Sequence, residues 1–438
     1  MADAPAGKAG DLHAELDRRA GEVERRVIGW RHHLHRYPEL PNREKHTAQL
    51  VIDHLESLGL DEVRTGVAGY GVVGVLRGGL PGERVIALRA DMDALPVRET
   101  SGVDFASTVV DDDYPGGPFP VAHACGHDCH TAMLMGAATV LAGARERLPG
   151  TVLFVFQPAE EGPPVDEPGG AARMEAEDAL ADPRPTMVYG HHVVPLPAGW
   201  VGYREGPQYA ASRMIKIVVT GHQVHGSTPW EGRDPLPPAA DIIAATGQLY
   251  RQIDAHQAVT VSIGHVEDVG RFNIIGERVT LWGTARCADE SGMAAVQRLV
   301  TRTADHIARA YGCAARVEFL QPVPPVRNAP AWVEAALPTL RRVAGEDRTV
   351  RSQPTLGYDD VSVFVNRYGG LYVMLGVQDI EMVDGVPRPV EGGRGLVVNH
   401  DPAFYADDSA LVTGVRLHAH VAADHLGGAL VPRTDPAP

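Results

Sequence analysis

The sequence predicts an α/β protein with a mostly parallel sheet and flanking helices, interrupted by an inserted α+β domain. Short apolar runs alternate with helical patterns in the first 208 residues and again after residue 326, and most runs end in a polar cluster. Between residues 209 and 325 the pattern is instead typical of antiparallel strands. The length of 438 residues also exceeds what one core normally serves. We therefore expect one domain built from 1–208 and 326–438, and a second built from 209–325.

The first part is expected to open with two helices and then to alternate strands with helices. Leu16, Val23, Val27 and Leu34 recur at helical spacing. The expected elements are that helix, ending near Pro38; a helix at Lys45–Leu58; strands at Val72–Leu76 and Arg84–Arg89; a helix at Thr131–Gly143; and strands at Thr151–Phe156 and Thr186–Tyr189. The unbroken apolar run Thr151–Phe156 is typical of a strand that is buried on both faces.

The inserted part and the last part are read in the same way. Ile215, Ile217 and Val219 alternate with other residues, as in a sheet with two unequal faces. The expected elements are strands at 214–219, Val259–His265, Arg278–Arg286 and Val317–Leu320, with helices at Pro235–Tyr250 and Met293–Tyr311. After them come a helix at Ala331–Val343, a strand at Leu371–Leu375 and a last helix that Pro402 is expected to open.

Composition excludes some partners. The net charge of −16 argues against nucleic acid, whose binding needs a basic face. No apolar run is long enough to span a bilayer, and the N-terminus lacks the pattern of a secretion signal, so we expect no membrane partner. The chain has four cysteines, of which two lie within one short cluster. That usage favours a reducing cytoplasm over a disulfide scaffold.

The cluster is the stretch His123–His130, with sequence His-Ala-Cys-Gly-His-Asp-Cys-His. Three histidines, two cysteines and an aspartate within eight residues suit a metal site, because thiolate and imidazole are metal ligands. A solvated polar loop is the alternative interpretation. A metal needs several ligands, so the rest of the chain has to supply them.

Acidic residues follow two of the expected strands. Asp91 and Asp93 come at the end of one strand, and Glu160 and Glu161 follow the next. Adjacent carboxylates repel each other unless cations are near, so one of the glutamates could bind metal while the other faces a substrate. The alternatives are a capping turn for the aspartates and an exposed acidic turn for the glutamates.

Histidines complete the candidate set. His191 and His192 end a third strand, and His400 precedes the expected last helix. The loop Gly221–Pro229 of the inserted part contains His222 and His225, which are equally well explained as solvated loop residues. A histidine pair at a sheet edge that already has acidic residues favours a ligand role for one of the two.

Together these motifs resemble the dinuclear-metal amidohydrolases of metallopeptidase clan MH. Within the clan, the chain is most similar to hippurate hydrolase, the N-acyl-amino-acid amidohydrolases and the plant hydrolases of auxin–amino acid conjugates. The resemblance covers nearly the whole chain. Its marks are Leu34–Leu40, Arg89–Pro96, His123–His130, Gln157–Glu161, the Gly221–Pro229 loop and His400. No single motif is specific, whereas the ordered set is.

The resemblance implies two divalent metal ions per subunit and a role for each matching residue. The implied metal ligands are Cys125, His127, Glu161, His192 and His400, with Cys125 bridging the ions. Glu160 matches the general base, Asp93 an acid that supports the metal site, and Asn273 a residue that helps to hold substrate. His225 matches a lid histidine that reaches the partner's site, which implies a homodimer formed through the inserted lid domain. Such mixed ligands suit zinc or manganese and also accept cobalt or nickel.

Several departures leave substrate preference open. Cys129 stands where relatives have glycine, Trp230 where histidine is common, and Gly276 where proline is expected. The expected function is hydrolysis of N-acyl amino acids or similar small-molecule amides by a metal-activated water. A metallo-dipeptidase or carboxypeptidase of the same clan, an inactive binding homologue and a nonmetal thiol hydrolase remain alternatives. Since His191 directly precedes His192, the ligand at that position could be either one.

Overall fold

The structure of the chain is a computed structural model that describes residues 6–384 and 386–432. The described chain forms two compact units. The first runs to Gly206 and includes Arg327–Gln353 and the chain from Val363 onward; the second comprises Pro207–Val326 and Pro354–Ser362. No pattern in the sequence indicated that Pro354–Ser362 clusters with the second unit. The domain limits 1–208, 209–325 and 326–438 remain our proposal.

The first unit is built on an eight-stranded mixed sheet with the order β1-β2-β6-β3-β7-β18-β8-β17. Its strands are β1 (Glu62–Val67), β2 (Gly71–Arg77), β3 (Leu80–Asp91), β6 (Pro149–Gln157), β7 (Met187–Pro197), β8 (Val201–Tyr203), β17 (Thr349–Arg351) and β18 (Gly370–Gln378). The four central strands β6, β3, β7 and β18 are parallel. Their carboxyl ends therefore meet at one edge of the sheet, which is where ligands bind in such folds.

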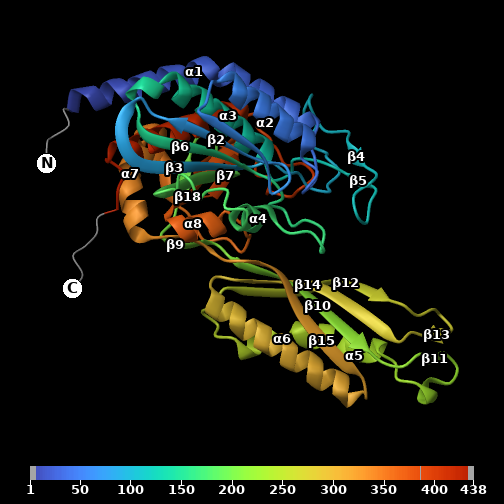
Figure 1. Cartoon of the computed structure of the whole chain (residues 1–438). Coiled ribbons are helices and arrows are strands. Elements are labelled where there is room, and N and C mark those ends of the chain that lie inside the picture. The colour runs from blue at the N-terminus through green and yellow to red at the C-terminus, as the bar shows by residue number, and fades with distance from the viewer. Residues whose placement is uncertain (1–5, 385, 433–438) are drawn as a thin grey trace, which may run out of the picture. The chain divides into compact units, whose positions relative to one another are not determined.

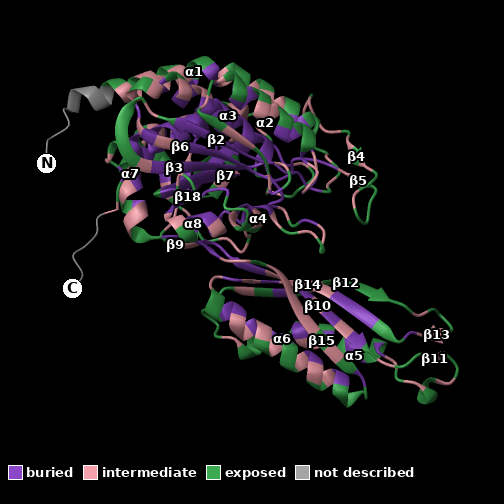
Figure 2. Ribbon diagram, in the orientation of Figure 1, coloured by how far each residue is buried: buried purple, intermediate pink, exposed green. Residues whose placement is uncertain are grey.

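Helices cover this sheet and close its core. They are α1 (Ala6–Arg36), α2 (Lys45–Ser57), α3 (His127–Gly143), α4 (Gly170–Ala176), α7 (Pro330–Ala344), α8 (Ser362–Tyr368) and α9 (Leu411–Gly427). The helices α3 and α9 pack against β3 and β7, and α1 contacts both helices. Figure 1 shows α1 beside α3. The central strands and the inner helix faces are buried, whereas the outer face of α1 is exposed (Figure 2). The carboxyl edge of the parallel strands is therefore supported by a closely packed core.

The second unit is a four-stranded antiparallel sheet with the order β12-β14-β10-β15. Its elements are β10 (Ala211–Thr220), β12 (Val259–Asp268), β14 (Arg278–Cys287), β15 (Ala314–Val323), α5 (Leu236–Thr246) and α6 (Glu290–Ala310). Residues Ile215, Ile217 and Val219 are fully buried against the helices, as the alternation along this strand predicted.

Short ribbons and 3₁₀ turns complete the described chain. The ribbons are β4 (Val110–Asp111) with β5 (Phe119–Pro120), β9 (Gly206–Tyr209) with β16 (Val326–Asn328), β11 (Val224–His225) with β13 (Ile274–Ile275), and β19 (Ile380–Val383) with β20 (Val386–Pro389). The turns are η1 (Arg145–Arg147), η2 (Pro229–Glu231), η3 (Leu249–Gln252), η4 (Glu346–Arg348) and η5 (Asp408–Ala410). No helix among the described residues is both long and apolar enough to cross a membrane.

The predicted fold class is confirmed, with corrections at element ends. The helix α3 begins at His127, four residues before the expected start, so half of the histidine–cysteine cluster forms its first turn. Strand β7 continues through His191 and His192 to Pro197. The expectation that Pro402 opens the last helix was wrong, since α9 begins at Leu411 after the turn η5. His127 of α3 and His192 of β7 contact Asp93 and Cys125 of other segments, so polar composition did not mark the ends of these two elements.

Gly136 marks a point at which three helices of the first unit pack closely. It lies in α3, and a Cβ atom there would stand 2.6 Å from Val27 Cγ2 of α1 and 2.9 Å from Val415 Cγ2 of α9. We predict that Gly136→Ala destabilises the protein by about 1–3 kcal/mol, because well-packed cores do not absorb an added methyl group. The measurement is the midpoint of thermal unfolding.

Gly29→Ala is the matched control for this substitution. It lies in α1, and a Cβ atom there would meet nothing within 4 Å. It should raise stability by up to about 1 kcal/mol through helix propensity alone. An equal gain in Gly136→Ala would show that the three helices pack less tightly than described.

Candidate metal centre

The candidate site lies at the carboxyl ends of the parallel strands β3 and β6 and beside the middle of β7, at His192. Cys125 and His127 flank Gly126, which adopts the left-handed backbone conformation with φ of 89°. A Cβ atom at Gly126 would stand 2.3 Å from Val193 Cγ2 of β7. Only glycine fits this close approach, which places the two flanking side chains against the strand that carries His192.

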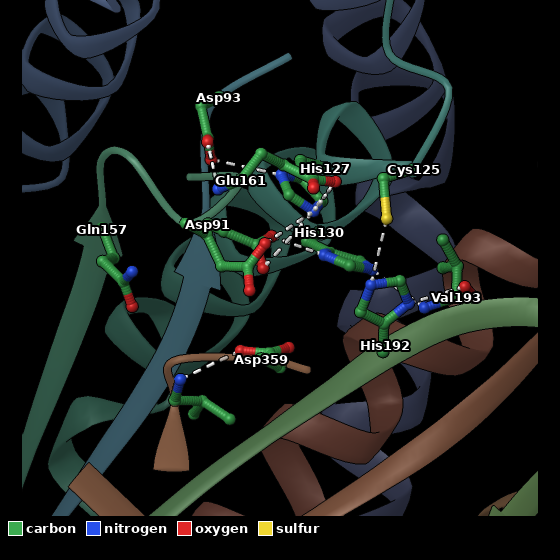
Figure 3. A network of polar contacts seen from close by, with 12 residues as sticks. Asp91, Asp93, Cys125, His127, His130, Gln157, Glu161, His192, Val193 and Asp359 are labelled. Atoms are coloured by element: carbon green, nitrogen blue, oxygen red, sulfur yellow. Dashed lines mark hydrogen bonds and ion pairs between the residues drawn. The ribbon is translucent and has the colours of Figure 1, made fainter. Parts of the chain in front are cut away.

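Cys125, His127 and His192 form one group of potential ligands, whose atoms all lie within 4.8 Å of one another. The Sγ of Cys125 is 3.3 Å from Nε2 of His192 (Figure 3). The Nδ1 of His192 lies 2.7 Å from the Val193 carbonyl oxygen and must donate to it. In a neutral imidazole this leaves a bare Nε2 that faces the thiol, which is the form that binds metal.

Cys125, Glu161 and His400 form a second group. The Nε2 of His400 is 3.2 Å from Oε1 of Glu161, and Nε2 of His127 is 3.7 Å from that oxygen. Cys125 therefore belongs to both groups, as a bridging ligand would. The structure brings all five residues that the family resemblance implied as ligands into one cluster.

His400 reaches the cluster from a distant part of the chain. Its backbone has φ of 71°, and its N–H donates to the Ala124 carbonyl. The side chain of the preceding residue, Asn399, donates to the carbonyls of Cys125 and Val193, at 3.0 and 3.1 Å. Asn399 thus joins three ligand-bearing segments, a role that no spacing in the sequence indicated.

Glu160 lies beside the ligands and is buried. Its Oε2 is 4.0 Å from Nε2 of His127. The turn that aims both glutamates passes through Ala159, whose φ of 52° is unusual for a residue with a side chain. The buried carboxylate of Glu44 accepts a hydrogen bond from the Ala159 N–H at 2.7 Å, which holds this turn in place.

Asp93 and Asp91 support the cluster from the end of β3. Asp93 Oδ2 accepts the backbone N–H of Glu161 at 2.8 Å, and its Oδ1 is 3.3 Å from Nδ1 of His127. A carboxylate at Nδ1 fixes the ring and leaves Nε2 for a metal. Asp91 Oδ1 is 2.5 Å from Nδ1 of His130, whose Nε2 accepts the Val193 N–H. The sequence singled out Asp91 beside Asp93 and His130 within the histidine–cysteine cluster but assigned neither a role of its own, although His130 follows His127 at i+3 on one helix face.

Acidic groups dominate the electrostatics of this cluster. Burial would lower the pKa of His127, but Asp91, Asp93 and Glu161 outweigh it and raise the pKa to about 10. Burial and then the charges of Glu161 and Glu160 raise the pKa of the Cys125 thiol well above its usual range. The Nε2 of His127 is also buried without a hydrogen-bond partner. A cation at this point would satisfy that nitrogen and the surrounding carboxylates, so the donor set fits a metal.

His191 and His192 point to opposite faces of β7, as neighbours in a strand do. The ring of His191 packs against His418 of α9, with centroids 4.4 Å apart, and neither of its nitrogens has a hydrogen-bond partner. His192 is the one that faces Cys125. The geometry therefore favours His192 as the ligand.

His225 and Asn273 lie in the second unit, on a ribbon of their own. Strand β11 pairs with β13, so that His225 is opposite Ile274, and the Gly226 N–H donates to the Asn273 carbonyl. The Nδ1 of His225 accepts the Ser227 N–H at 3.1 Å. A neutral His225 therefore presents Nε2–H as a donor, and its side chain is exposed.

Comparison with known proteins gives consistent matches. Residues 87–424 match the model of peptidase family M20/M25/M40. Thermostable carboxypeptidase 2 of Saccharolobus solfataricus is 34% identical over 416 residues, which are 94% of this chain and 98% of that protein. N-acetylcysteine deacetylase of Bacillus subtilis is 31% identical, over 91% of this chain and 96% of that protein.

A solved structure is similar over the same length. It is a Bacillus subtilis protein described as a dinuclear metal-binding peptidase of the M20 family. It is 29% identical, with a TM-score of 0.72, and the match covers 93% of this chain and 99% of that one. The family resemblance that the motifs indicated is thereby confirmed.

The two histidines of β7 provide a direct test of the site. We predict that His192→Ala lowers the metal content of the purified protein, because it removes a side chain that faces Cys125. His191→Ala should retain the metal content, since its ring lies on the other face of the strand. Metal is measured by elemental analysis on folded, gel-filtered protein. Loss of metal in His191→Ala with normal metal content in His192→Ala would show instead that His191 is the ligand.

Proposed function

The chain belongs to peptidase family M20/M25/M40, and on that premise we propose that it is a metal-dependent amidohydrolase that releases an amino acid from N-acyl amino acids or similar amides. The observation that carries the proposal is the pair of ligand groups that share Cys125, with the buried Glu160 beside them. Amide hydrolysis needs an activated water, a polarised carbonyl and a proton for the leaving nitrogen, and this arrangement contains a residue or a site for each.

Five residues would hold two divalent ions. Cys125, which belongs to both groups, would help to hold them together with His127 and His192 of one group and Glu161 and His400 of the other. When bound, such a metal pair polarises the substrate carbonyl and makes a water molecule acidic enough to attack at neutral pH. Thiolate and imidazole favour zinc, and the mixed set also accepts manganese, cobalt or nickel.

Glu160 is the proposed general base. Its carboxylate is buried at the site and would take a proton from the attacking water, then return it to the leaving nitrogen. Asp93 holds the ring of His127 and the backbone of Glu161, so its role is to keep the ligands oriented rather than to transfer protons.

The relatives support a substrate with an amino acid as leaving group. A carboxypeptidase and an N-acetylcysteine deacetylase both act on an amide whose nitrogen belongs to an amino acid with a free carboxylate. The sulfur ligand Cys125, where peptidase relatives of the clan use aspartate, favours the amidohydrolase. Because the chain is similar to a carboxypeptidase of Saccharolobus solfataricus, carboxypeptidase activity is the second candidate function.

A substrate panel on the metal-loaded protein tests the proposal. N-acetyl and N-benzoyl amino acids should be hydrolysed faster than acylated dipeptides, and the carboxamide of each substrate should be poor. Exhaustive chelation should abolish turnover, and zinc or manganese should restore it. Faster release from acylated dipeptides would establish the carboxypeptidase instead. A protein that retains its metal and hydrolyses none of these amides would fit an inactive binding homologue, whereas chelator-resistant activity would favour a thiol hydrolase.

The role of Glu160 gives a sharper prediction. Glu160→Gln should keep its metal but lose at least a factor of about 100 in kcat, because an amide cannot accept the proton. Glu167→Gln is the control, since Glu167 lies on the following loop and pairs with Arg43. Metal content and kcat are measured on the same preparations. A Glu160→Gln enzyme with near-normal turnover would remove this residue from the mechanism.

We also infer that His225 and Asn273 act in the site of a second copy of this chain. The second unit contributes the Nε2–H donor of His225, which suits stabilisation of the negative oxygen that develops during attack. In a symmetric dimer the exchange would be reciprocal.

The described cysteines are free thiols, which supports a cytoplasmic location for such a dimer.

Complementation between two inactive variants tests this exchange. In a dimer of His225→Ala with Glu160→Gln, one site has both defects and the other has none. Random mixing of equal amounts makes about half of the dimers mixed, so activity should recover to about a quarter of the wild-type value. The variants are co-expressed with different affinity tags, which proves that mixed dimers formed. Mixed dimers without activity would show that His225 acts within its own chain or has no part in turnover.

A further inference from the structure

A buried ionic network joins the first helix to both of the segments that present histidines to Glu161. Its centre is Arg31 of α1, which is 2% exposed. The motif Leu34–Leu40, one of the marks of the family resemblance, begins three residues later and has no part in the proposed chemistry. The contacts of Arg31 and His35 indicate what this part of α1 does.

The first arm of the network reaches the start of α3. The Nε of Arg31 donates to Oδ2 of Asp128 at 2.9 Å, and Asp128 directly follows His127. His35 lies one turn after Arg31 on the same face of α1, and its Nδ1 is 2.9 Å from the same carboxylate oxygen. Two side chains of one helix therefore fix the turn from which His127 projects.

The second arm reaches the segment that follows His400. The Nη1 of Arg31 donates to the Ala406 carbonyl at 3.3 Å and to Oδ1 of Asp408 at 2.9 Å. A parallel connection runs from Nε2 of His35 to Glu99, at 2.9 Å, and from the Thr100 N–H to the Pro402 carbonyl, at 2.7 Å. Both arms are short, and they join elements that are distant in the sequence.

We propose that Arg31 and His35 are positioning residues that fix the spacing between His127 and His400 and thereby set the affinity for metal. The inference rests on the metal ligands proposed above. Nε2 of His127 and Nε2 of His400 approach Glu161 Oε1 from two different segments, at 3.7 and 3.2 Å. Coordination tolerates errors of only about 0.2 Å, so a shared anchor for the two segments matters. The planar fork of arginine serves several acceptors in fixed directions, whereas the compact ammonium of lysine lacks this fixed geometry and the reach of the guanidinium.

Removal of Arg31 would leave Asp128 buried without its guanidinium partner, so Arg31→Lys is the conservative variant. Asp408→Ala is the second variant, because Asp408 is only part-buried and its loss removes the Arg31–Asp408 pair of the second arm, together with the His32–Asp408 contact, while the Arg31–Asp128 pair stays intact. The matched control is Asp407→Ala. Its side chain accepts a hydrogen bond from the Ser409 N–H in the same turn. Among the described residues, no hydrogen bond joins Asp407 to Arg31.

The experiment is a zinc titration of the metal-free protein in competition with a chromogenic chelator, which needs no activity. Each variant is first shown to be folded by circular dichroism and gel filtration. In Arg31→Lys and Asp408→Ala, at least one zinc dissociation constant should rise about 10–100-fold, the range for partners that orient ligands. Asp407→Ala should match the wild type within error.

Each outcome decides the matter. Unchanged zinc affinity in folded Asp408→Ala overturns the proposal, and so does an equal loss in Asp407→Ala, which would reflect a loosened loop. If Arg31→Lys fails to fold, the comparison between Asp408→Ala and Asp407→Ala still decides. A wild-type protein that binds no zinc overturns the proposed ligands as well, whereas normal binding by wild type and variants overturns the positioning role alone.

Discussion

The structure depends on the burial of negative charge at the carboxyl edge of the central sheet. Asp91, Asp93, Glu160 and Glu161 all approach His127 within about 4 Å, where water cannot screen them. Such a concentration of carboxylates is costly unless positive charge lies among them. The raised pKa of His127 expresses this demand, because the surrounding carboxylates favour positive charge at this ring.

Several close contacts hold the segments that carry the proposed ligands in fixed positions. Gly126 lets α3 approach β7 closely, Asn399 ties the His400 segment to both, and Arg31 connects α1 to the two ends of the arrangement. Each contact lies in or beside a buried layer. Cys125, Glu161 and His400 lie on connecting segments, and these contacts tie the segments to packed helices and strands, which is the condition for precise metal coordination.

The two units contribute different residues to the proposed chemistry. All five proposed ligands and Glu160 belong to the first unit, whereas His225 and Asn273 sit on an exposed ribbon of the second. An exposed donor gains catalytic value only when a site closes around it and excludes water. This is the physical argument behind the proposal that the ribbon acts in a partner's site.

The sequence by itself determined the fold class, the strands and helices of the core, and the residue types at the candidate site. Apolar periodicity is a local property, so Thr151–Phe156 and the alternation at Ile215–Val219 could be read directly. The motif order also indicated the family and its ligand residues. Tertiary structure alone decided that His192 rather than His191 faces Cys125, that α3 starts inside the cluster, and that Pro402 opens no helix. It also revealed Asp91, His130, Asn399 and Arg31 as supports, because their partners lie far away in the sequence and only folding brings them within hydrogen-bond distance.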